Sequence, residues 1–119
     1  MSNGLEKLKS KEEISLLFKA GINSYYFPFR ITYLFKTKES GIGYFISVPK
    51  KQFKKAVDRN KIRRQINEVF IKKINLDYFS DKKLILCISF TAKNKINFNE
   101  IEKKLIEAFR IFIKKTEKE

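Results

Sequence analysis

Histidine is absent from this sequence of 119 residues, and cysteine occurs once. Without histidine, the chain lacks the side chain that most readily carries protons or binds metals near neutral pH. A single cysteine cannot form an intramolecular disulfide or build a zinc site. Apolar residues surround Cys87, which predicts a reduced core residue rather than a nucleophile. The four glycines match the spacing of no phosphate-binding loop.

Acidic residues are scarce, because 13 Asp and Glu stand against 27 Lys and Arg, for a formal charge of +14. Asp77 and Asp81 could in principle bind magnesium. They lie among lysines with no third carboxylate near in sequence, however, and this favours a solvated turn. We therefore predict no catalytic residue and no metal site in the chain itself.

Long apolar runs are missing as well. No segment approaches the roughly 20 apolar residues that span a bilayer, and the first residues contain no apolar signal core. We therefore expect a cytoplasmic protein without a membrane partner. The charge of +14 then favours a nucleic acid as the partner.

The most prominent feature that is present is a basic run over residues 50–64. Eight of its fifteen side chains are cationic, and Asp58 is its only acid. From Ala56 onward, apolar residues recur at the spacing of a helix that lies on a core. The other side of this helix is then basic, which suits a polyanion with regularly spaced phosphates. The alternative is a basic face that is merely solvated.

Helical geometry predicts how these side chains are displayed. Arg59 and Arg63 fall on one flank of the apolar stripe, whereas Asn60 and Asn67 share the solvent side. The planar donors of arginine match phosphate oxygens two at a time, and asparagine suits ribose or base edges. The predicted binding residues are Lys50, Lys51, Lys54, Lys55, Arg59, Asn60, Lys61, Arg63, Arg64 and Asn67.

The remaining patterns predict an α+β fold for a single domain of residues 1–119, a sandwich of a mixed sheet and helices. The expected first helix spans 10–20, with Ser10 and Glu13 as a capping box. Strands over 29–36 and 44–48 are expected to form a hairpin through a turn at 38–43. After the basic helix, we expect a loop at 75–81, a central strand over 84–90, and a closing helix capped by Asn97 or Asn99.

The segment Val57-Asp58-Arg59-Asn60-Lys61-Ile62-Arg63-Arg64, preceded by Ser47-Val48-Pro49-Lys50-Lys51, resembles the signature of the protein subunit of bacterial ribonuclease P. The resemblance covers most of the chain. It implies a ferredoxin-like variant with the order α-β-β-β-α-β-α, a left-handed crossover, and a short additional strand near 24–27. Two departures stand out. Phe53 and Lys54 occupy a stretch where the family commonly has a glycine, and Asn67 stands where a third arginine often closes the motif.

The resemblance also implies a function. Such a subunit binds the catalytic RNA and the 5′ leader of precursor tRNA, assists endonucleolytic removal of the leader, and leaves catalysis and Mg²⁺ to its RNA partner, one protein per RNA. A general RNA-binding or ribosome-associated module is the alternative, and a free-standing nuclease is disfavoured because the acid cluster is missing.

In the family, the first helix and the adjacent sheet face form a cleft for the single-stranded leader. The matching positions in this chain are Ile14, Phe18, Arg30 and Thr32. Ile14 replaces a common aromatic residue, so one stacking platform is expected to be missing. The competing interpretation is that Ile14 and Phe18 simply anchor the helix on the sheet.

Overall fold

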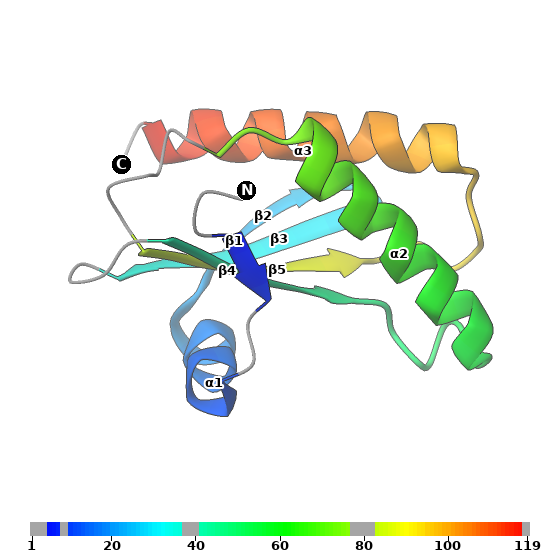
Figure 1. Ribbon diagram of the computed structural model, residues 1–119, viewed down its shortest axis with the longest axis horizontal. Helices are drawn as coiled ribbons and strands as arrows, with labels where there is room; N and C mark the ends of the chain where they lie inside the picture. The colour runs from blue at the N-terminus through cyan, green and yellow to red at the C-terminus, as the bar shows by residue number, and fades with distance from the viewer. Residues whose placement is uncertain (1–4, 8–9, 37–40, 77–82, 118–119) are drawn as a thin grey trace.

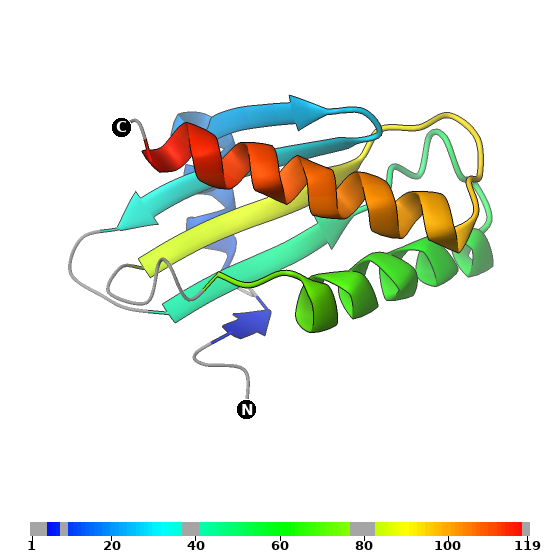
Figure 2. The same cartoon turned by 90° about the horizontal axis from the view of Figure 1, so that it is seen from above.

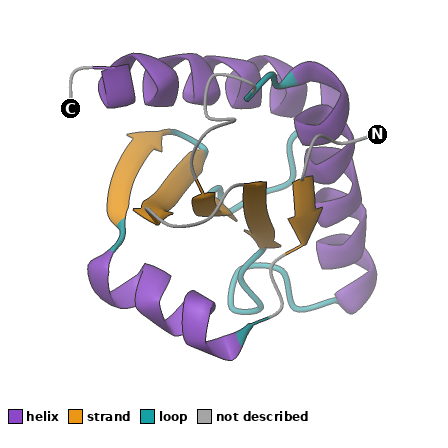
Figure 3. Cartoon of the chain, turned by 60° about the vertical axis from the view of Figure 1, so that its left-hand side comes forward, coloured by secondary structure: helices purple, strands orange, loops and turns teal. Residues whose placement is uncertain are grey.

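The computed structural model describes residues 5–7, 10–36, 41–76 and 83–117, which form one sheet with helices on both of its faces (Figure 1). The elements are β1 (Leu5–Lys7), α1 (Lys11–Ala20), β2 (Ile22–Tyr26), β3 (Phe29–Lys36), β4 (Gly41–Ser47), α2 (Ala56–Lys73), β5 (Lys83–Phe90) and α3 (Phe98–Glu117). Helices α2 and α3 cover one face, and α1 lies on the other (Figures 1 and 3). The predicted α+β order is confirmed from α1 to α3, and β1 precedes it.

Strand β5 lies at the centre of the five-stranded sheet, whose order is β1-β4-β5-β3-β2. Its residues from Leu84 to Phe90 are all buried, because apolar side chains point to both faces. The predicted hairpin between the strands over 29–36 and 44–48 is therefore wrong. Strand β3 pairs antiparallel with β2 and with β5, and β4 pairs parallel with β5. Strand β5, whose apolar side chains point to both faces, thus lies at the position where both faces of the sheet are covered.

The connection from β4 through α2 to β5 is a left-handed crossover. Seen from the helix side, both strands run from left to right, β5 lies above β4, and α2 passes in front of the sheet (Figure 2). When the strands are turned to point upward, β5 therefore lies to the left of β4. About 98% of such connections are right-handed. The handedness implied by the resemblance is therefore confirmed.

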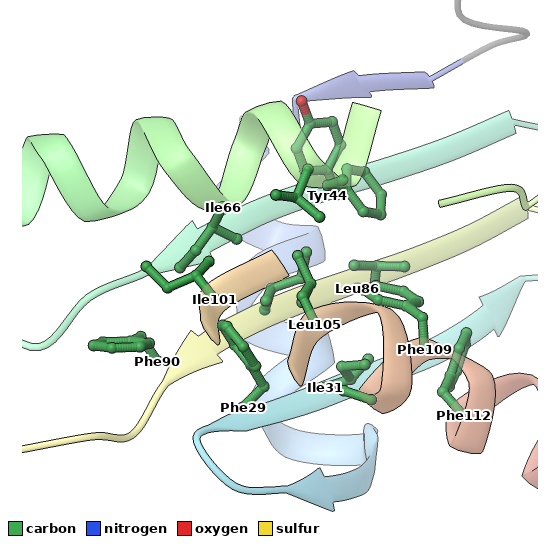
Figure 4. Packing of buried hydrophobic residues seen from close by; sticks show 14 of the residues in the cluster. Phe29, Ile31, Tyr44, Ile66, Leu86, Phe90, Ile101, Leu105, Phe109 and Phe112 are labelled. Carbon is green, nitrogen blue, oxygen red and sulfur yellow. The ribbon is translucent and has the colours of Figure 1, made fainter. Parts of the chain in front are cut away.

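The main hydrophobic core lies between the sheet and helices α2 and α3 (Figure 4). Aromatic rings fill much of it, and Phe109 is in ring contact with both Phe70 and Phe112. A smaller cluster of Leu17, Ile85 and Cys87 lies under α1. Burial raises the pKa of the Cys87 thiol, as expected for the core cysteine that the sequence predicts.

Local sequence signals set the helix ends. The Ser10 side chain accepts a hydrogen bond from the Glu13 amide at 3.2 Å, and the Asn97 side chain accepts one from the Glu100 amide at 2.9 Å. Gly21 follows α1 at a point where a Cβ atom would lie 2.3 Å from the Leu17 carbonyl oxygen. A side chain therefore has no room at this position.

Two strand boundaries differ from the prediction. Strand β4 begins at Gly41, inside the expected turn, and Gly41 has a φ of 108° that favours glycine. Strand β1 was not predicted, since its three residues are too few to show a period. Residues 38–40 of the predicted turn, together with Asp77 and Asp81, lie outside the described residues.

Candidate nucleic-acid interface

Two loops meet at the end of the sheet where β4 and β5 finish. Because these strands are parallel, the segments over 48–55 and 91–97 leave the sheet at the same end. The Lys95 ammonium lies 3.0 Å from the Asp58 carboxylate and so joins the second segment to the start of α2. Lys93 and Lys95 are exposed and therefore extend the basic surface that the sequence placed on residues 50–64. The sequence alone does not show that the segments over 48–55 and 91–97 lie close together, because this depends on the parallel pairing of β4 and β5.

Arg59 fixes the loop that precedes α2. Its Nη1 donates hydrogen bonds to the carbonyl oxygens of Phe53 at 2.8 Å and of Lys54 at 2.9 Å. The Phe53 ring is buried, with its centroid 5.8 Å from that of Phe90. The residue that departs from the family pattern is therefore a core anchor. Arg59 holds the loop in place, and the phosphate contact that the sequence suggests for it stays a prediction.

The predicted flanks of α2 are partly rearranged. Arg63 Nη1 donates to Asn60 Oδ1 at 2.7 Å on the exposed surface. Asn67 was expected to face solvent together with Asn60, but this placement is wrong. Asn67 is half-buried, and its Oδ1 accepts a hydrogen bond from the Tyr44 hydroxyl of β4 at 2.7 Å. The helix leans on β4 at this position, which its own periodicity does not reveal.

Most of the predicted basic residues do reach solvent. Those classed as exposed are Lys50, Lys51, Lys54, Lys55, Asn60, Lys61 and Arg64, while Arg59 and Arg63 are half-buried. Lys55 is the N-cap residue of α2, and its side chain makes no capping hydrogen bond. Helix amides that are left without a side-chain cap attract anions. This corner of the molecule therefore combines a helix N-terminus with exposed ammonium groups.

The predicted leader residues lie on the sheet face that carries α1, and they differ in exposure. Phe18 is 57% exposed and meets the Phe45 ring edge-on at a centroid distance of 6.0 Å. Arg30 is exposed, whereas Ile14 is half-buried against the smaller core. Thr32 is buried, and its hydroxyl donates to Asn23 Oδ1 at 2.7 Å. Phe18 and Arg30 are thus accessible from solvent, whereas Ile14 and Thr32 are not exposed.

Among the described residues, no three His, Cys, Asp or Glu side chains gather into a group that could hold a metal ion. In the same part of the chain, no helix is long and apolar enough to cross a membrane. The predicted binding residues described above are suited to bind a polyanion through charge, hydrogen bonds and ring contacts.

The sequence model of the ribonuclease P family matches residues 3–112. The chain belongs to the ribonuclease P protein family. The solved ribonuclease P protein of Staphylococcus aureus is 26% identical and superposes with a TM-score of 0.70, covering 88% of this chain and 93% of that one. The ribonuclease P protein of Thermotoga maritima is 21% identical, with a TM-score of 0.64 and coverage of 86% and 93%. Among curated protein sequences, none matches.

Membership of the ribonuclease P protein family makes the chain a protein subunit of ribonuclease P, associated with ribonuclease P RNA and taking part in tRNA processing. The likeness to the Thermotoga maritima protein bears on the fold alone, and that fold agrees with the sheet and helices described above. The 26% identity to the Staphylococcus aureus protein extends over nearly the whole of both chains.

Proposed function

We propose that this subunit binds the catalytic RNA of ribonuclease P through the basic surface formed by the loop over 48–55, the first half of α2 and the segment over 91–97. The 5′ leader of precursor tRNA lies on the α1 side of the sheet, against Phe18 and Arg30. The RNA partner supplies the catalytic centre and Mg²⁺, with one protein per RNA in the cytoplasm.

The observation that carries this proposal is the convergence of cations at one end of the sheet. Exposed Lys50, Lys51, Lys54 and Lys55 lie beside the uncapped start of α2, and Asp58, the acid in its first turn, is paired with Lys95. Each phosphate that a cation neutralises releases counterions and strengthens RNA binding at low salt. The protein thereby screens repulsion between the catalytic RNA and the precursor tRNA.

The test is a cleavage assay with precursor tRNA, using RNA-free protein, ribonuclease P RNA alone, and the two together. We expect no cleavage by the protein alone, and cleavage at a lower magnesium concentration when the protein is added to the RNA. Cleavage by rigorously purified protein would contradict the proposal. Binding of many RNAs without any effect on cleavage would instead favour the general RNA-binding module.

Charge location is tested by a matched pair of variants. Replacing Lys61 and Arg64 of α2 with glutamine should weaken RNA binding and reduce the slope of log affinity against log salt by about 0.7 to 0.9 per lost phosphate contact. Replacing the exposed Lys103 and Lys114 of α3 removes the same charge elsewhere and should have a smaller effect. Equal effects would mean that only the net charge matters.

A further inference from the structure

Two large aromatic side chains are exposed where β2 turns into β3. Tyr25 is 59% exposed and Phe27 is 60% exposed. Most of the other aromatic residues are buried or half-buried, as their contribution to a core requires. The exposure of these two rings is therefore a feature that the packing of the protein does not explain.

The strand register places Tyr25 on the same sheet face as the predicted leader residues. Asn23, two residues earlier, is hydrogen-bonded to Thr32, which lies against the end of α1 at Gly21. Side chains two residues apart on a strand point to the same face. Tyr25 is paired with Arg30 across β2 and β3, so the ring and the guanidinium are neighbours on this face.

The row that begins with this pair continues across the sheet on small side chains. Arg30 is paired with Ser89 of β5, and Ser89 with Ser47 of β4. Of the described helices, only α1 lies on this face, and it covers the part of the sheet away from the ends of β4 and β5 (Figure 1). A flat ligand can therefore lie along the row beside Tyr25.

The Tyr25 ring is held in place. Its hydroxyl lies 3.4 Å from Oγ1 of Thr91, just beyond the end of β5. The Thr91 amide in turn donates to the Pro28 carbonyl oxygen at 2.8 Å, which ties this segment to the β2–β3 turn. An exposed ring whose position is restrained loses little entropy when a base stacks on it.

The charge of the surroundings selects the ligand. Arg30 lies beside the ring, and the basic segments over 48–55 and 91–97 leave the sheet at the same end. An apolar protein surface would have to desolvate these cations without compensation. An unpaired nucleotide supplies both a flat base for the ring and a phosphate for the guanidinium.

We propose that Tyr25 and Arg30 form a second nucleotide platform, in which Tyr25 stacks on an unpaired leader base and Arg30 contacts the adjoining phosphate. This inference rests on the proposed function. Phe18 lies against Phe45 of β4, and β4 is three inter-strand steps of about 4.8 Å from β2, so the strands under the two platforms are about 14 Å apart. A stacked nucleotide step is about 3.4 Å, so the platforms contact different leader nucleotides.

The test uses precursor tRNAs with leaders of increasing length and single-stranded RNA oligonucleotides that carry 2-aminopurine at successive positions. Tyr25→Leu removes the ring, and Tyr25→Phe is the matched control that keeps it. We expect Tyr25→Leu to weaken binding of long leaders by about 5-fold or more, the low end of a base-stacking contribution, and to leave short leaders unaffected. Quenching of one 2-aminopurine position should disappear in Tyr25→Leu and persist in Tyr25→Phe.

Equal binding of all leader lengths by Tyr25→Leu and the unmodified protein would overturn the inference. So would an equal loss for long and short leaders, since that result is typical of a structural role, and thermal unfolding of the variant would show it directly. The oligonucleotide measurement needs no ribonuclease P RNA. A failure of the unmodified protein to stimulate cleavage would therefore refute the proposed function separately from the platform.

Discussion

Replacing Arg59 with alanine should destabilise the fold more than it weakens RNA binding. The guanidinium donates two hydrogen bonds to loop carbonyl oxygens, of Phe53 and Lys54. Hydrogen bonds that involve a charged group contribute about 1.5 to 3 kcal/mol when buried. Arg59 is only half-buried, so we expect a loss of about 1.5 to 3 kcal/mol for the pair together.

The matched control is Arg63→Ala, one turn further along the same helix. Arg63 donates to the exposed side chain of Asn60, and the loss of such a surface contact should change stability by no more than about 0.5 kcal/mol. Arg63→Ala should instead reduce the slope of log affinity against log salt by about 0.7 to 0.9, the value for one lost phosphate contact. Arg59→Ala should leave most of that slope intact.

The measurements are urea unfolding, with the slope m checked for constancy, and RNA affinity at several salt concentrations below the unfolding transition. For a chain of this size, each kcal/mol corresponds to roughly 3 to 6 °C in the midpoint of thermal unfolding. The reasoning would be refuted if Arg59→Ala kept full stability and lost as much salt dependence as Arg63→Ala. Arg59 would then be an RNA ligand, as the sequence pattern predicts.

Three further substitutions test the fold and the leader face. Phe18→Ala should cost about 1 kcal/mol or less, well below the 3 to 5 kcal/mol of a core phenylalanine, and should weaken binding of precursor tRNA but not of mature tRNA. Phe53→Ala should cost about 3 kcal/mol in urea unfolding, because the ring is buried against Phe90. Gly21→Ala should lower the unfolding midpoint, since its Cβ would meet the Leu17 carbonyl oxygen; an unchanged midpoint would show that the chain moves aside at little cost.

Much of the fold was predictable because its signals are local. The apolar period from Ile62 to Phe70 predicted α2, which the structure ends at Lys73. The run from Leu84 to Phe90 is apolar except at Ser89 and therefore predicted a central strand. The closing helix was predicted with two alternative caps, and the hydrogen bond to Glu100 assigns Asn97.

The failures concern contacts between segments that are distant in sequence. Consecutive strands usually pair, which is why a hairpin between β3 and β4 was expected. In the structure, β5 lies between these two strands and pairs with both. Periodicity placed Asn67 correctly on its own helix, yet it cannot show that this flank leans on Tyr44. Lys95 lies close to Asp58 only because β4 and β5 are parallel.

The exposure of ring side chains was equally beyond the sequence. Phe18 belongs to the same apolar stripe as Leu17, but Leu17 is completely buried while Phe18 is 57% exposed. A stripe indicates which side of a helix faces the sheet, and the edge of that contact depends on the neighbouring strands. The exposed position of Tyr25 beside Arg30 was missed as well, because it depends on the register between β2 and β3.

The insertion of β5 between β3 and β4 also governs how this chain can fold. Phe29 is paired with Phe90, and Lys36 with Lys83, so the strand that pairs with the inner edge of β3 comes from late in the sequence. During synthesis, β3 and β4 have no shared neighbour until residues 83–90 have left the ribosome. Contacts of such long sequence separation slow folding, since the chain must close large loops before the pairing compensates. Because α2 precedes β5 in the sequence, the basic helix is synthesised before the strand that completes the sheet beneath it.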